Sequence, residues 1–170
     1  VQAPMKVGPI DVVPFVAGRL TAYDEDFMDY VGNSEKARLW GQVGVRLHTQ
    51  VSKTYDDVEI RALDVHRLRH IVEPSIDLSL SGANLNSEDL PVFDPEVERI
   101  REGATSRFGV RQTFQTERGG TGRWRTVDWV VMNTDVVLAS KDTDTDTAIA
   151  RFIGFRPEFS TGGDHFHSDV

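Results

Sequence analysis

The stretch "LRHIVEPSIDLSLS", residues 68–81, decides the fold expected of this chain. Side chains of a β-strand point alternately to opposite faces, so even-numbered and odd-numbered residues can be compared. The even row is apolar apart from one histidine: Leu68, His70, Val72, Pro74, Ile76, Leu78 and Leu80. The odd row is polar apart from one isoleucine: Arg69, Ile71, Glu73, Ser75, Asp77, Ser79 and Ser81. This alternation predicts a strand with one apolar face and one polar face.

The same alternation recurs before and after this stretch. In "ARLWGQVGVRLHTQVSK", residues 37–53, a small or apolar row alternates with a polar row that contains Arg38, Gln42, Arg46 and His48. Residues 12–23, 104–117 and 124–140 also alternate, and a bulge near Val130 and Val131 would restore the pattern in the last of them. A shorter strand is expected in residues 148–155, and the alternation starts again at residues 165–170. The sequence therefore predicts an all-β, antiparallel up-and-down meander of long strands.

Turn and loop signals separate these strands. The glycine-rich "ERGGTGR", residues 117–123, predicts a hairpin turn. Residues 24–36, 54–66, 81–103 and 141–147 are long or acidic and are expected to be loops, with at most one or two helical turns in residues 95–103.

Composition narrows the class of protein. The chain has 27 acidic and 19 basic residues and no polybasic run, which is unlike a general nucleic-acid-binding protein. It contains no cysteine, so it has neither disulfides nor thiolate metal ligands. No apolar run approaches the roughly 18 to 20 residues of a membrane-spanning helix.

Strand length leaves two interpretations open. Strands of about 10 to 14 residues are longer than the roughly 5 or 6 of ordinary sheets, and they suit a tilted membrane-crossing strand of about 9 to 11 residues with overhangs. The polar rows fit the solvent face of a soluble sheet and the polar lumen of a membrane barrel equally well.

A family resemblance enters at "RHIVEP", residues 69–74, and at the loop "LPVFD", residues 90–94. The two motifs resemble the barrel domain of the LptD family of lipopolysaccharide-assembly outer-membrane proteins, also called organic solvent tolerance proteins. Residues 108–136 resemble the next hairpin in divergent, non-proteobacterial members, and "FRPEFS", residues 155–160, resembles the segment that leads into a further strand. The resemblance covers residues 13–160, and its specific motifs lie in residues 68–94 and 107–160.

The resemblance implies a transport function without covalent chemistry in the outer membrane of a Gram-negative type of cell. Lipopolysaccharide or a related glycolipid would be inserted into the outer leaflet, its sugars passing through a polar lumen and its acyl chains leaving sideways between poorly paired strands. The implied partners are this glycolipid, the periplasmic bridge proteins of the transport system, a plug lipoprotein and the outer-membrane lipids.

The resemblance also gives each row of side chains an environment. The candidates for facing the lumen are Arg38, Arg46, Arg69, Glu73, Asp77, Arg107 and Arg111. The candidates for facing lipid are Val43, Val45, Leu47, Val72, Ile76, Leu78 and Leu80. Pro91, Phe93 and Asp94 of the family-motif loop are expected to form a structural clasp.

The number of strands bears on the extent of the domain. Five or six strands are expected, whereas the smallest single-chain barrels have about eight. Residues 1–170 are therefore interpreted as part of one partial transmembrane β-barrel, a fragment whose N-terminal periplasmic domain and remaining strands lie elsewhere. The alternative is a soluble extracellular antiparallel β-sandwich or small barrel that acts as a binding module.

Other candidate sites have simpler interpretations. Arg38, Arg46, Arg107, Arg111, Arg123 and Arg125 could bind phosphates, but pairing with acidic neighbours is favoured, and an ion pair from Arg69 is expected for Glu73 and Asp77. "DTDTD", residues 142–146, lacks the glycine and glutamate of a calcium loop, and His165 and His167 lack a third ligand. Trp40, Trp124, Trp129, Tyr23, Tyr30 and Tyr55 fit an aromatic girdle at a membrane interface, although core packing explains Trp129 equally well. Because no catalytic motif is present, we expect no enzymatic activity and no cofactor.

Overall fold

The computed structural model describes residues 1–23, 37–86, 102–120, 122–140 and 164–170. In these residues the chain forms strands β1 (Met5–Val7), β2 (Ile10–Ala22), β3 (Ala37–Thr49), β4 (Val51–Ile60), β5 (Val65–Ala83), β6 (Gly103–Arg118), β7 (Arg125–Ala139) and β8 (His165–Asp169). A single 3-10 turn, Arg61–Leu63, lies between β4 and β5, and none of the described residues is in an α-helix. The chain is therefore all-β, as the sequence predicts.

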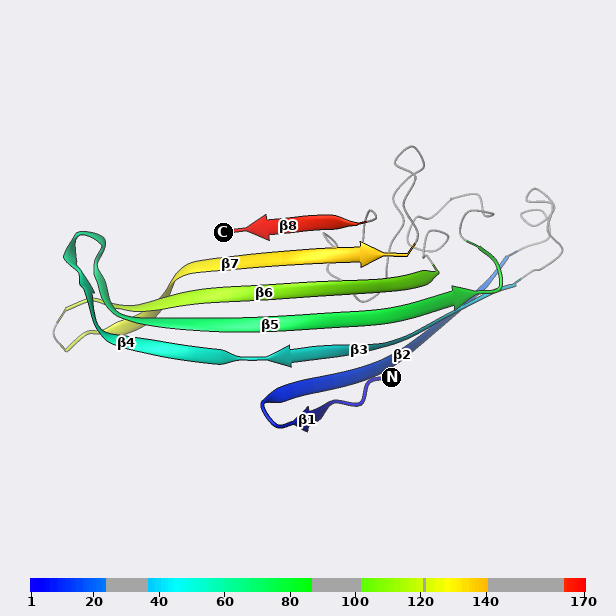
Figure 1. Ribbon diagram of the computed structural model, residues 1–170, viewed down its shortest axis with the longest axis horizontal. Coiled ribbons are helices and arrows are strands. Elements are labelled where there is room, and N and C mark those ends of the chain that lie inside the picture. The colour runs from blue at the N-terminus through cyan, green and yellow to red at the C-terminus, as the bar shows by residue number, and fades with distance from the viewer. Residues whose placement is uncertain (24–36, 87–101, 121, 141–163) are drawn as a thin grey trace.

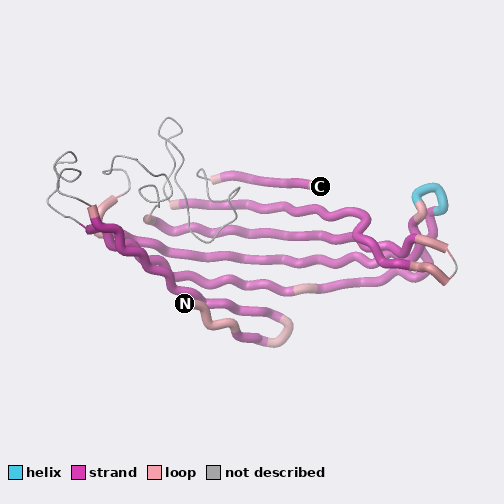
Figure 2. The backbone as a smooth tube through the Cα atoms, turned by 180° about the vertical axis from the view of Figure 1, so that it is seen from behind, coloured by secondary structure: helices cyan, strands magenta, loops and turns pink. Residues whose placement is uncertain are grey.

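The strands form one antiparallel sheet in the order β1-β2-β3-β5-β6-β7-β8, with β4 also paired to β5 (Figure 1). Each strand pairs with the one before it in the chain, apart from this insertion of β4, so the predicted up-and-down meander is confirmed. The sheet is not closed into a barrel; β1 and β8 are its end strands, and among the described strands β4 pairs with β5 alone. Figure 2 shows the described strands as a single layer.

β3 and β4 behave as one strand with a short interruption. His48 pairs with Ser75 at the end of β3, and Val51 pairs with Val72 at the start of β4, so the register is the same on both sides of the break. Pro74 of β5 lies opposite this break. Because proline has no N–H to donate, we attribute the interruption to the missing ladder hydrogen bond.

The strands are longer than the sequence indicates. β5 has 19 residues and β6 has 16. The expectation of a loop at residues 54–66 is wrong, because β4 continues to Ile60 and only residues 61–64 connect it to β5. Acidic residues such as Asp56 and Glu59 made this segment look like a loop in the sequence. In the structure arginines pair with both of them at the end of the strand.

Two other details of the meander agree with the sequence. The turn at residues 117–123 does join β6 to β7 as a hairpin, and the register between these strands shifts where Phe114 pairs with Val130 and Gln115 with Asp128. The bulge therefore lies at Trp129, next to the predicted position. The strand predicted at residues 148–155 and the helical turns at residues 95–101 lie outside the described residues.

The register sorts the side chains onto two faces of the sheet. We call one the polar face; across β3, β5, β6 and β7 it carries Arg46, Asp77, Arg107 and Val137 in one row. We call the other the apolar face; it carries Val45, Leu78, Ser106 and Leu138 in the neighbouring row. The alternation read from the sequence is thus continuous across neighbouring strands.

Burial is the reverse of what a water-soluble sheet shows. The buried side chains lie mostly on the polar face, where Arg38 and Asp135 are each 2% exposed. On the apolar face Leu39 is 61% exposed and Leu80 is 59% exposed. In the described part of the chain no second layer of structure packs on these apolar side chains.

Candidate functional site

A chain of ion pairs crosses four strands on the polar face. Asp77 of β5 lies between two arginines: its Oδ2 is 2.7 Å from Nη1 of Arg107, and its Oδ1 is 3.9 Å from Nε of Arg46. Arg107 continues to β7, where its Nη2 lies 2.6 Å from Oδ1 of Asp135. Two arginines and two aspartates alternate, so their charges balance without an external ion.

A second and looser group lies next to this row on the polar face. Glu73 of β5 is 3.9 Å from Nε of Arg111 and 3.8 Å from Nε2 of His48. Together with Arg107 and Asp135, these side chains line a cavity of about 270 Å³. Glu73, Arg111 and His48 are partly exposed, so the cavity is a hydrated, charge-lined depression rather than a closed pocket.

Hydroxyl groups continue the polar face toward the end of β5. Ser79 Oγ lies 2.6 Å from Thr105 Oγ1, and Ser81 donates to the carbonyl of Gly103 at 3.2 Å. At the same end the buried Arg38 donates to the carbonyl of Leu85 and contacts Glu102. These contacts satisfy the hydroxyls and the Arg38 guanidinium at this end of the polar face internally, which lowers the cost of burying them.

Two glycines leave room for the long side chains of the polar face. A Cβ at Gly109 would clash with the carboxylate of Asp135 and come within 2.7 Å of Ser75 Oγ. A Cβ at Gly44 would come within 2.5 Å of the ring of Phe15, over which the Arg46 guanidinium lies at 4.5 Å. The ion pairs and the aromatic contact both depend on the missing side chains.

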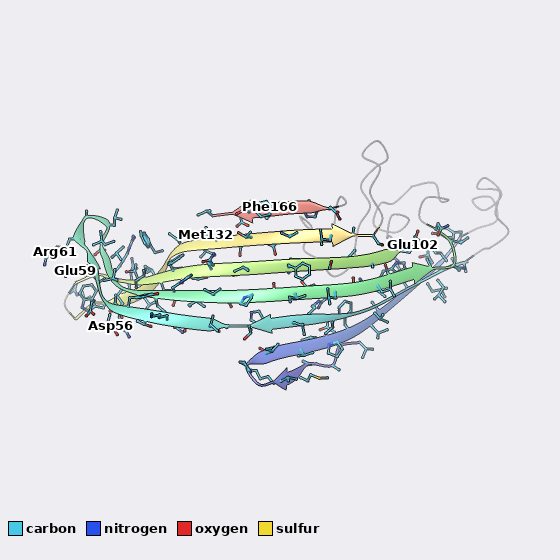
Figure 3. The ribbon with its side chains drawn as sticks, in the orientation of Figure 1. Asp56, Glu59, Arg61, Glu102, Met132 and Phe166 are labelled. Carbon is cyan, nitrogen blue, oxygen red and sulfur yellow. The ribbon has the colours of Figure 1, made fainter. Side chains whose placement is uncertain are left out.

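The strands β4 to β7 extend beyond the apolar rows, at the left of Figure 1. There Arg67, in the left-handed conformation with φ of 53°, is 2.8 Å from Asp56 and 3.0 Å from Glu117. These contacts raise the pKa of Arg67, with Glu117 the stronger cause, and the hydrogen bond from Arg61 lowers the pKa of Glu59 (Figure 3). Charged contacts thus add to the packing of the buried Val65 in holding this extension together.

Every residue expected in the lumen that the structure describes lies on the polar face: Arg38, Arg46, Arg69, Glu73, Asp77, Arg107 and Arg111. Every residue expected to face lipid lies on the apolar face: Val43, Val45, Leu47, Val72, Ile76, Leu78 and Leu80. Pro91, Phe93 and Asp94 lie outside the described residues. The structure therefore separates the two candidate sets by face.

One expected ion pair is wrong. Arg69 contacts neither Glu73 nor Asp77; its Nη2 is 3.4 Å from the hydroxyl of Ser52. The carboxylates are instead paired with arginines of neighbouring strands, because directly opposite residues lie closer than residues along one strand. Arg38, Arg46, Arg107 and Arg111 pair with acidic side chains as expected, whereas no carboxylate among the described residues contacts Arg123 or Arg125.

The histidines of β8 lie on the polar face, and His167 Nε2 is 3.2 Å from Asp169 Oδ1. The described residues contain no group of three or more side chains suited to holding a metal ion, and residues 142–146 lie outside them. Of the aromatic residues, Trp40 is buried on the polar face and so does not fit a girdle, Tyr55 lies on the apolar face, and Tyr30 is outside the described residues.

Sequence reasoning missed Asp135 and His48 as members of the charged groups. Asp135 was hidden because the bulge at Trp129 shifts the parity of β7; with the bulge placed, Asp135 falls opposite Gly109 on the polar face. His48 was visible in the polar row of β3 but had no evident partner until β5 was placed beside it.

No family model, curated protein or solved structure matches this chain. The resemblance to the LptD family therefore stays a prediction. In the described part of the chain, no helix is long and apolar enough to cross a membrane.

We predict that Arg107→Gln destabilises the fold by about 3–5 kcal/mol, because two poorly exposed carboxylates, Asp77 and Asp135, would lose their common partner. The matched control is Arg111→Gln on the same strand and face. Arg111 is about half exposed and its contact to Glu73 is long, so the cost should stay below about 1 kcal/mol. Urea unfolding followed by tryptophan fluorescence measures both, and equal costs would contradict the proposed role of the row.

Proposed function

We propose that residues 1–170 are part of an outer-membrane β-barrel that transports lipopolysaccharide or a related glycolipid. The observation that carries the proposal is the inverted arrangement of the sheet, with buried ion pairs on one face and exposed leucine, valine and phenylalanine on the other. Exposed apolar patches of this extent mark contact with lipid or with another apolar surface.

The size of the apolar face supports a bilayer as its environment. On β3 and β4 the apolar row runs from Leu39 to Val51, and its part from Gly41 to Val51 is paired on β5 with Gly82 to Val72. At about 3.3 Å per residue and a tilt of about 40°, this length spans about 30 Å of depth, close to the hydrocarbon thickness of a bilayer. β4 to β7 extend beyond the apolar rows at one end of the sheet, and in this proposal their polar ends project into water.

The polar face suits a hydrated lumen. Its arginines and aspartates neutralise one another, while the partly exposed Arg111 and His48 remain accessible for hydrogen bonding to sugars. In this proposal the glycolipid sugars pass along this face, without covalent chemistry, and the acyl chains leave between strands. Periplasmic bridge proteins would deliver the lipid, and a plug lipoprotein would occupy the lumen.

The proposal requires further strands to pair with β1 and β8. Within the hydrocarbon region, each unpaired N–H or C=O at an open edge costs several kcal/mol, so only a closed barrel is stable there. The break between β3 and β4 opposite Pro74 is not a further open edge of β5. Along the same residues β5 stays paired with β6.

We predict that Leu78→Arg destabilises the protein in phosphatidylcholine vesicles by about 2–4 kcal/mol, because the charge would sit near the bilayer midplane. Leu78 is 40% exposed, so in a water-soluble sheet the same change should cost about 0.5 kcal/mol or less. The control is Leu68→Arg, on the same strand and face but beyond the apolar rows. Urea unfolding from vesicles measures the difference, and equal, small costs would favour the soluble binding module instead.

Transport itself is tested by photo-crosslinking in Gram-negative cells that make lipopolysaccharide. A crosslinking amino acid at Ser79, on the polar face, should form an adduct that antibodies to the lipopolysaccharide sugars detect. At Leu80, on the apolar face, the crosslinker should label membrane lipid. Labelling of membrane lipid at position 80 without sugar adducts at position 79 would agree with a membrane protein but would contradict glycolipid transport.

A further inference from the structure

The side chains on the apolar face change in type from one row to the next where β4 to β7 extend beyond the apolar rows. The last apolar row contains Val51, Val72, Gln112 and Met132, paired across the four strands. The next row contains Lys53, His70, Phe114 and Val130, with the rings of His70 and Phe114 stacked at 4.2 Å. Beyond it Tyr55 lies beside Leu68, and Lys53 lies 5.0 Å from the Tyr55 ring. Aromatic and basic side chains in this order are typical of a membrane–water interface.

The hairpin that ends this face carries an unusual cross-strand pair. Arg118 of β6 lies directly opposite Arg125 of β7, although like charges in this position repel each other. No carboxylate among the described residues contacts Arg118, Arg123 or Arg125. Glu117, the acidic residue beside them, is instead held by Arg67 at 3.0 Å.

The Arg118 side chain is also incompletely satisfied. Its Nη2 donates to the carbonyl of Leu63 at 3.4 Å, but its buried Nε has no hydrogen-bond partner among the described residues. A buried donor without a partner costs free energy, and a guanidinium fork suits a phosphate. An anion between Arg118 and Arg125 would therefore remove the repulsion, and a turn of the Arg118 guanidinium toward it would also give the Nε donor an acceptor.

We propose that Arg118 and Arg125, with Arg123 in the turn between them, bind the phosphate of an anionic lipid headgroup at one rim of the apolar face. The inference rests on the proposed function, because it takes the apolar face to lie in the bilayer. Arg118 lies about 13 Å along β6 beyond Phe114, about 10 Å of depth at a tilt of about 40°. Long arginine side chains reach back toward the headgroups over such distances. A lipid is favoured over free phosphate because the site continues the interfacial rows of the same face.

The test compares insertion of the complete barrel, residues 1–170 together with the strands that pair with β1 and β8, into vesicles of phosphatidylcholine alone and of phosphatidylcholine with phosphatidylglycerol, measured by flotation. The chain should prefer the anionic vesicles. Arg118→Gln/Arg125→Gln should lower that preference by about 25-fold, about fivefold for each arginine. In neutral vesicles the double variant should be as stable as the unmodified chain or more so, because the repulsion is gone; a purely structural role would predict a loss of stability there.

The matched control is Lys6→Gln/Arg61→Gln, which removes two positive charges that already contact Asp11 and Glu59. It should leave the preference for anionic vesicles intact. Equal insertion of the unmodified protein into both kinds of vesicle would overturn the inference alone. Stabilisation by inorganic phosphate without vesicles, equal to the stabilisation by anionic vesicles, would also overturn the inference alone. Failure of the complete barrel to insert into either kind would overturn the proposed function and the inference with it.

Discussion

The two-residue period of the β-strand is the constraint on which the whole structure depends. Because neighbouring side chains must point to opposite faces, a shift of one residue would move Asp77 and Arg107 to the apolar face and Leu78 and Ser106 to the polar one. The ion pairs from β3 to β7 hold the strands in one register, since Asp77 contacts arginines on both of its neighbouring strands. The register in turn keeps the apolar rows continuous across the sheet.

The two faces place opposite demands on their surroundings. On the polar face, removing Asp135 from water is tolerated because Arg107 accompanies it, at a close distance and beside a glycine that leaves room for both. On the apolar face, Leu39, Leu80 and Phe108 gain nothing from the sheet itself, since the described residues place no layer over them. A lipid environment would remove that cost, and the polar extension of β4 to β7 would mark where lipid gives way to water.

Much of the fold could be predicted from residue parity, because the rows around Val43 and Ile76 are clean and the register follows from them. The loop at residues 54–66 was mispredicted because a charged strand lacks an apolar row. Arg61 contacts the nearby Glu59, and Arg67 reaches Asp56 only because β5 pairs with β4. The partners of Glu73 and Asp77 could not be predicted either, because strand order decides which arginine is nearest. The one-residue bulge at Trp129 similarly concealed Asp135.

The central claim is that the apolar face meets lipid while the polar face meets water. Since the chain has no cysteine, single substitutions Leu80→Cys and Ser79→Cys allow a spin label on each face of β5. In vesicles, electron paramagnetic resonance should show the label at position 80 relaxed mainly by oxygen, which dissolves in the bilayer, and the label at position 79 relaxed mainly by a water-soluble nickel chelate. Access of the nickel chelate to both labels would contradict the claim.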